Sequence, residues 1–129
     1  MNTITWQFQA SIPGGPALSI TQPNIAVGAY DVASAKIGAS ASNIDVVVQP
    51  SSSPGDVVFV VVSSDIYDAK LTYTIDGGAP HALDAPHVML GAGAVGFMTG
   101  DGKPPQTLTF TSKLATDANI QVVAGCKNP

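Results

Sequence analysis

The stretch Val57-Val58-Phe59-Val60-Val61-Val62 decides the fold of this chain. Pro54-Gly55-Asp56 comes before it and Ser63-Ser64-Asp65 after it, so turn-forming residues bound it at both ends. Its side chains are all β-branched or aromatic, which predicts a strand with apolar side chains on both faces. An antiparallel sheet in a single domain normally leaves one face in water. We therefore expect this strand to be central and its second face to be covered by another subunit.

Alternation of apolar and polar residues predicts most of the other strands. The clearest runs from Thr3 to Ile12, where Ile4, Trp6 and Phe8 share the inward face of a half-buried strand. A hairpin or corner is expected at residues 13–16, because Pro-Gly-Gly-Pro breaks the pattern. Further strands are expected at residues 18–21, 25–37, 44–49, 71–75, 80–83, 86–90, 107–112 and 119–124.

Turn-forming residues predict short connections between these strands. Asp76-Gly77-Gly78 tolerates positive φ and predicts a hairpin between residues 71–75 and 80–83. Residues 50–55 predict a polar loop, across which the strands on either side pair or pack nearby. No helix is expected beyond a single turn near residues 33–36. The chain is thus predicted to be all-β, a single-domain antiparallel β-sandwich over residues 1–129, jelly-roll-like or alternatively immunoglobulin-like.

Charged residues are few and uniform in kind. They make up 11% of the 129 residues, against about 25% on average, and comprise nine aspartates and five lysines. The net charge of -4 and the lack of arginine argue against nucleic acid as a partner. No apolar run approaches the roughly 20 residues of a membrane helix, and no export signal is visible. We expect cytoplasmic synthesis without a signal peptide, no membrane partner, and use within an assembled particle.

Two patterns resemble ligand sites, one made of glycines and one made of histidines with an aspartate. Residues 91–96 match G-x-G-x-x-G, but the residues that follow do not predict the helix that a dinucleotide site needs, so no cofactor is assigned. His81, Asp84 and His87 are weak candidates for a metal site, because imidazole and carboxylate groups ligate transition metals. Metal sites usually need three or four ligands, and two histidines on a loop are more often solvated.

Other polar and aromatic residues give weaker signals. Tyr30 and Tyr67 are weak candidates for ligand contact, whereas Trp6 and Tyr73 are expected in the core. Cys126, the only cysteine, excludes an intrachain disulfide, and no G-x-S-x-G motif is present, so no catalytic residue is assigned. Five aspartates in turns are candidate calcium ligands, although aspartate in turns more often bonds backbone groups: Asp65, Asp68, Asp76, Asp101 and Asp117.

These features favour a non-enzymatic structural protein that forms a homo-oligomer of capsid, shell, decoration or fibre type. Oligomer interfaces are apolar and depleted of charge at their centres, as this composition is. We assign Val58, Val60 and Val62 to that interface. Two alternatives remain: a small β-sandwich module that binds a surface glycan or a protein partner, and a cupin-like metal-dependent enzyme.

Overall fold

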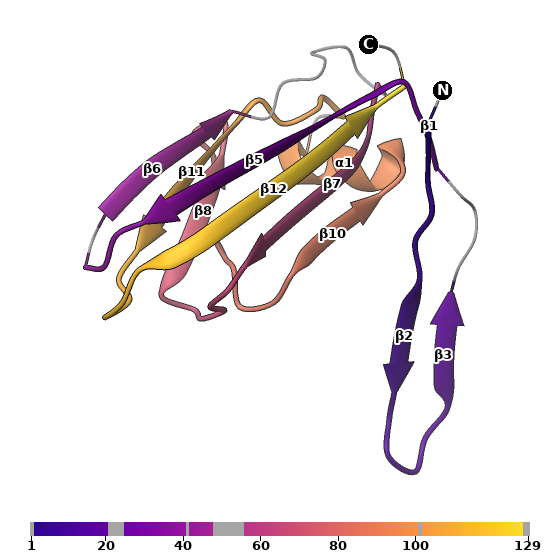
Figure 1. Cartoon of the computed structure of the whole chain (residues 1–129), viewed down its shortest axis with the longest axis horizontal. Helices are drawn as coiled ribbons and strands as arrows, with labels where there is room; N and C mark the ends of the chain where they lie inside the picture. The colour runs from indigo at the N-terminus through magenta and orange to yellow at the C-terminus, as the bar shows by residue number, and fades with distance from the viewer. Residues whose placement is uncertain (1, 21–24, 41, 48–55, 101, 128–129) are drawn as a thin grey trace.

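Two four-stranded antiparallel sheets lie face to face and form the body of the protein (Figure 1). The computed structural model describes residues 2–20, 25–40, 42–47, 56–100 and 102–127. One sheet has the strand order β10-β7-β12-β5 and the other has the order β6-β11-β8-β9. These eight strands are β5 (Ala29–Ile37), β6 (Ser42–Val47), β7 (Val57–Ser64), β8 (Leu71–Ile75), β9 (His81–Ala82), β10 (His87–Leu90), β11 (Thr107–Ser112) and β12 (Ala118–Cys126). The predicted all-β sandwich is confirmed.

The eight strands pair from the ends of the sequence inward. β5 pairs with β12, β6 with β11, β7 with β10 and β8 with β9, and every pair is antiparallel. Successive pairs alternate between the two sheets, which is the connectivity of a jelly roll. As a consequence β6 and β7 lie in opposite sheets and do not pair with each other. The polar loop expected at residues 50–55 lies outside the described residues.

The core lies between the two sheets and is built from alternate residues of each strand. Leu108 and Phe110 on β11 are fully buried, with the threonines of the same strand toward the outside. Tyr73 on β8 is buried as expected, and its ring lies 5.2 Å from that of Phe110 between centroids. At the end of β8, Asp76 and Gly77 both adopt positive φ, 51° and 76°, which gives the predicted hairpin turn into β9.

A helix, α1 (Ala92–Thr99), follows β10, contrary to the expectation of an all-β chain without helices. Three glycines at residues 91–96 argue against a helix, since glycine costs about 1 kcal/mol relative to alanine in a helix interior. Tertiary burial overrides this cost, because Val95 and Met98 are buried in the core and α1 packs on β7 and β10. Residues 33–36, where a helical turn was expected, belong to β5. No helix in the described part of the chain is long and apolar enough to cross a membrane.

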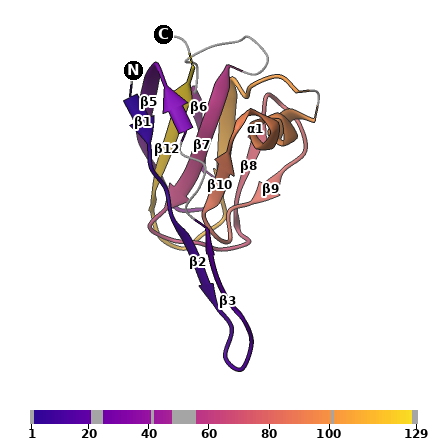
Figure 2. The same ribbon diagram turned by 90° about the vertical axis from the view of Figure 1, so that its right-hand side faces the viewer.

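The N-terminal segment forms two small antiparallel pairs in place of the single half-buried strand that was expected. β1 (Asn2–Ile4) pairs with β4 (Ile25–Val27), and β2 (Phe8–Ser11) pairs with β3 (Ala17–Ile20). Trp6 lies between β1 and β2 and is half-buried, so its assignment to the core is corrected. The β2–β3 hairpin projects beyond the sandwich, as both views show (Figures 1 and 2).

Candidate functional site

The projecting hairpin, residues 8–20, is the most unusual surface of the molecule, and we call it the arm. Residues 13–16 reverse the chain at its tip, as the sequence predicts. Gly14 adopts a φ of 75°, which glycine tolerates without steric cost, and Gly15 N–H donates to the carbonyl of Ile12 at 2.8 Å. The arm is therefore a defined β-hairpin.

The arm is amphipathic, with an apolar and a polar face. Phe8 stands opposite Ile20 and Ala10 opposite Leu18, so these side chains share one face, while Gln9, Ser11 and Ser19 lie on the other. The exposed fractions are 50% for Phe8, 60% for Ile12, 48% for Leu18 and 41% for Ile20. A two-stranded hairpin is marginally stable at best in water. The apolar face thus needs a cover that the described residues of its own chain do not supply.

The β1–β4 pair anchors the arm to the body. A Cβ atom on Gly125 would lie 2.9 Å from Val27 Cγ1 and 3.5 Å from Ile4 Cδ1, so these two side chains fill the space above this glycine. Gly125 pairs with Phe59, and a Cβ on the glycine would lie 3.6 Å from that of Phe59. Glycine here allows the close approach of the anchoring pair to the outer face of the sheet.

Four valines form a continuous row across the outer face of the same sheet, and we call this row the stripe. Val88 pairs with Val61, Val61 with Val123, and Val123 with Val32, so the row spans all four strands. Val88 and Val32, at its two ends, are 49% and 47% exposed, and the two central valines are half-buried. The next row along the strands is polar, with Ser34, Gln121 and Ser63.

The assignment of Val58, Val60 and Val62 to an interface is corrected by their burial. Their exposed fractions are 5%, 0% and 0%, and Val60 and Val62 belong to the core between the sheets. A second subunit cannot reach them without unfolding the first. The face of β7 that remains accessible carries Phe59 and Val61, both half-buried.

His87 forms a hydrogen bond with the buried side chain of Tyr73. His87 Nδ1 lies 2.5 Å from the hydroxyl oxygen of Tyr73, and burial raises the pKa of Tyr73 to about 12. Burial also lowers the pKa of the His87 imidazole, an effect that the nearby carboxylate of Asp84 opposes. The Tyr73 hydroxyl and His87 Nδ1 are thus hydrogen-bonded, with the donor and acceptor roles set by the tautomer of the imidazole. His81, the remaining metal candidate, is exposed, with its ring 6.0 Å from that of Tyr73.

The described residues do not assemble a metal site from these candidates. Among them no three His, Cys, Asp or Glu side chains are grouped so that they could hold a metal ion. The two large sheets also stay separate and form no closed barrel around these residues. His81, Asp84 and His87 therefore lie near one another without forming a ligand set.

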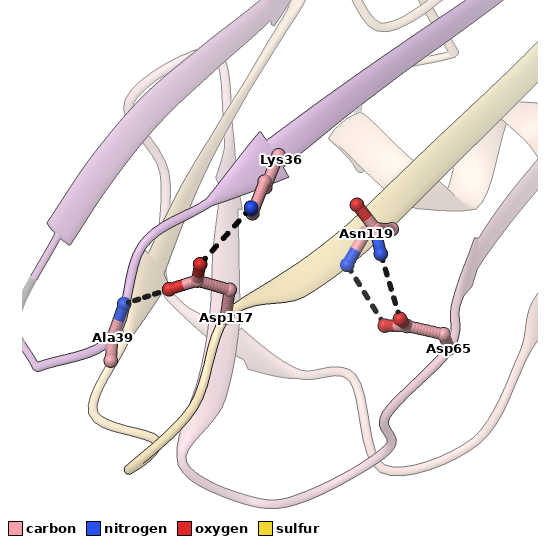
Figure 3. Close-up of polar contacts among 5 residues, drawn as sticks. All are labelled: Lys36, Ala39, Asp65, Asp117 and Asn119. Carbon is pink, nitrogen blue, oxygen red and sulfur yellow. Dashed lines mark hydrogen bonds and ion pairs between the residues drawn. The ribbon is translucent and has the colours of Figure 1, made fainter.

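The candidate calcium ligands accept hydrogen bonds within the fold. Asp65 accepts bonds from the backbone N–H and the side-chain amide of Asn119, at 2.8 and 2.9 Å, which lower the pKa of this carboxyl (Figure 3). Asp117 accepts the N–H of Ala39 at 3.0 Å and forms an ion pair with Lys36 at 3.2 Å (Figure 3). The others are Asp68, bonded to Lys70 N–H, Asp76, bonded to Gln106 and Thr107 N–H, and Asp101, which lies outside the described residues.

The glycine-rich motif lies where a strand meets a helix, yet its setting differs from that of a dinucleotide site. β10 runs antiparallel to β7, whereas the dinucleotide motif follows the first strand of a parallel β-α-β unit. Gly91 and Gly100 flank α1 with positive φ, and the N–H of Gly100 donates to the carbonyl of Gly96. Gly91 and Gly100 thus mark the start and the end of the helix.

Exposed aromatic side chains are scattered over the body. Tyr30 is 61% exposed on the outer edge of β5, while the Tyr67 hydroxyl accepts the N–H of Ser64 at 3.1 Å and is 37% exposed. Phe97 on α1 is 83% exposed and borders a cleft of about 710 Å³ that His81 also lines. Sequence reasoning missed Phe97, because its exposure depends on a helix that glycine content disfavours.

No protein-family model, no curated protein and no solved structure matches this chain. The chemistry and geometry of its own surface are therefore the basis for assigning a function.

Proposed function

We propose that this chain is a non-enzymatic structural protein that assembles with copies of itself, of capsid, shell, decoration or fibre type. The observation that carries the proposal is the apolar face of the arm together with Ile12 at its turn, since these four large side chains are 41–60% exposed. Exposed apolar patches with polar surroundings mark protein interaction sites. The polar face of the same hairpin suits water, so the arm has the two-sided pattern of a strand pair that packs on one side only.

Charge distribution supports assembly through this part of the chain. Residues 1–30 contain no Asp, Glu, Lys, Arg or His, so every charged side chain lies further along the sequence. Charge is depleted at the centres of protein interfaces, and homodimer interfaces are more apolar than other protein surface. The jelly-roll fold agrees with an assembly role by analogy alone, since the same fold also serves lectins and cupins.

Light scattering coupled to size-exclusion chromatography tests the proposal on the full chain. We expect the wild type to be an oligomer and the Phe8→Asp/Leu18→Asp variant to be a monomer with an unchanged far-ultraviolet circular dichroism spectrum. The matched control is Gln9→Asp/Ser19→Asp, which places the same charge on the polar face of the arm and should leave the oligomer intact. A wild type that stays monomeric at high concentration overturns the proposal.

A glycan-binding module is the second candidate, favoured by the 83% exposure of Phe97 beside the cleft. Sugars stack on exposed aromatic rings, which offer an apolar surface of defined geometry. Glycan-array binding by the wild type that is lost in Phe97→Ala and kept in Phe8→Ala would favour this function. No binding to any glycan would remove it.

A further inference from the structure

We infer that the arm of one copy docks, with its apolar face down, on the stripe of a second copy. This inference rests on the proposed function and names the two surfaces that meet. The arm presents Phe8, Leu18 and Ile20 on one face, with Ile12 exposed at the start of its turn, and the stripe presents four valines in a row across a sheet. β-structures pack well face to face when both contact surfaces are apolar, as the two sheets of a sandwich do.

The two surfaces match in size. The apolar face of the arm and the stripe with Tyr30 beside it each expose on the order of 400 Å² of apolar surface, which is comparable to the larger patches on monomers. A reciprocal pair of such contacts, related by a twofold axis, would cover four patches of this kind, at most roughly 1,600 Å² with each patch fully buried. That is the usual area of a stable, specific protein interface.

The two surfaces also match in charge. The arm carries no charged side chain. On the outer face of the sheet, the charged groups Lys36 and Asp117 lie beyond the polar row, away from the stripe. The neighbouring Asp31 alternates to the opposite face of the edge strand β5. Docking on the stripe therefore removes apolar groups from water, whereas docking over the far end of the sheet would desolvate a charge.

The anchoring pair shows that this outer face already accepts a β-ribbon. Val27 and Ile4 fill the space over Gly125, in the row of residues next to the stripe. An arm from a second copy on the stripe would extend this covered apolar surface by one row. The arm of the same chain leaves the body beyond the end of the sandwich, and its exposed side chains show that it does not cover its own stripe (Figure 2).

Complementation between two full-length variants tests the inference. The stripe variant, Val32→Lys/Val88→Lys, keeps a normal arm, and the arm variant, Phe8→Asp/Leu18→Asp, keeps a normal stripe. Each should be a monomer alone. An equimolar mixture should form a heterodimer in analytical ultracentrifugation, at higher concentration than the wild type needs, because one intact arm meets one intact stripe in place of two such contacts. The matched control for the stripe variant is Ser34→Lys/Gln121→Lys on the polar row of the same face, which should remain oligomeric.

The outcomes separate the inference from the proposed function. If the wild type is a monomer, both fall. A second outcome is a wild-type oligomer, a monomeric arm variant and a stripe variant that stays oligomeric. In that case the protein assembles, but its arm pairs with another arm, and this result overturns the inference. If both variants are monomers and their mixture does not associate at a hundredfold the concentration at which the wild type does, the stripe is not the partner of the arm.

Discussion

Strand β11 and the arm both alternate apolar and polar side chains, and they lie in opposite environments. Leu108 and Phe110 on β11 are 0% exposed, because β11 pairs on both sides and packs against the opposite sheet. Phe8 and Ile12 on the arm are 50% and 60% exposed, because the hairpin has two strands and the part of the chain that the structure describes places no sheet beneath it. An amphipathic β-pattern therefore predicts that one face of a strand is buried, while the number of strands around it decides whether the same chain buries that face.

The same substitution in the two regions should give the largest contrast. Phe110→Ala removes a fully buried ring and should lower the free energy of unfolding by about 3–5 kcal/mol. Phe8→Ala should change the stability of the monomer by less than about 0.5 kcal/mol, since its ring is half exposed. Urea denaturation of both variants at low protein concentration measures the difference. A comparable loss in Phe8→Ala would mean that the arm folds onto its own body.

The attachment of the arm offers a second contrast, this time between two glycines. Gly125→Ala places a Cβ atom 2.9 Å from Val27 Cγ1, so we expect a loss of about 1–3 kcal/mol as the anchoring pair shifts. Gly93→Ala on the exposed face of α1 meets nothing within 4 Å and should stabilise the helix by about 0.5–1 kcal/mol. Hydrogen exchange should become faster at residues 2–4 and 25–27 in Gly125→Ala alone. Unchanged exchange there would mean that the anchoring pair does not depend on this contact.

Most of the body could be predicted from its sequence, because its strands alternate cleanly and its turns carry Asp and Gly. The bounds of β11 match the expected residues 107–112, and the turn at Asp76 has the positive φ that its sequence indicates. Two features could not be predicted. α1 depends on the burial of Val95 and Met98, which overrides weak helix propensity. On β7 both faces are apolar, so the pattern cannot say which face belongs to the core.

The sequence predicts an apolar surface outside the core, but not which residues form it. A strand apolar on both faces predicted one face in the core and one outside it. The structure shows that Val60 and Val62 lie in the core and that Phe59 and Val61 lie on the outer face. The stripe is visible only when four strands distant in sequence are set in register. The exposure of the arm could likewise not be predicted, because residues 3–12 have the pattern of a half-buried strand, whereas the described residues of the chain provide no opposite layer.

Acidity should weaken the body without acting on the arm, which has no histidine or carboxylate. Burial holds the pKa of His87 in the folded state below the value of 6.5 expected for the unfolded chain. Below about pH 6.5 the unfolded chain therefore binds a proton first, so stability falls with pH until the folded state is protonated as well. Thermal melts at about pH 7.5 and about pH 5.5 should show this loss in the wild type and in His81→Gln, and a smaller loss in His87→Gln. Equal losses in all three proteins would exclude His87 as the cause.

Removing the part of the arm beyond the Phe8–Ile20 pair should leave the stability of the body unchanged. Phe8 stands opposite Ile20 in the antiparallel β2–β3 pair, so replacing residues 9–19 with Asn-Gly closes a two-residue hairpin of the favoured kind and keeps the half-buried Trp6. The shorter connection reduces the entropy lost on closing the loop, so we expect a free energy of unfolding equal to or slightly above that of wild-type monomer. Urea denaturation at a concentration where the wild type is dissociated makes the comparison fair. A marked loss of stability would show that the arm supports its own subunit, and its exposed apolar face would then need a different explanation from assembly.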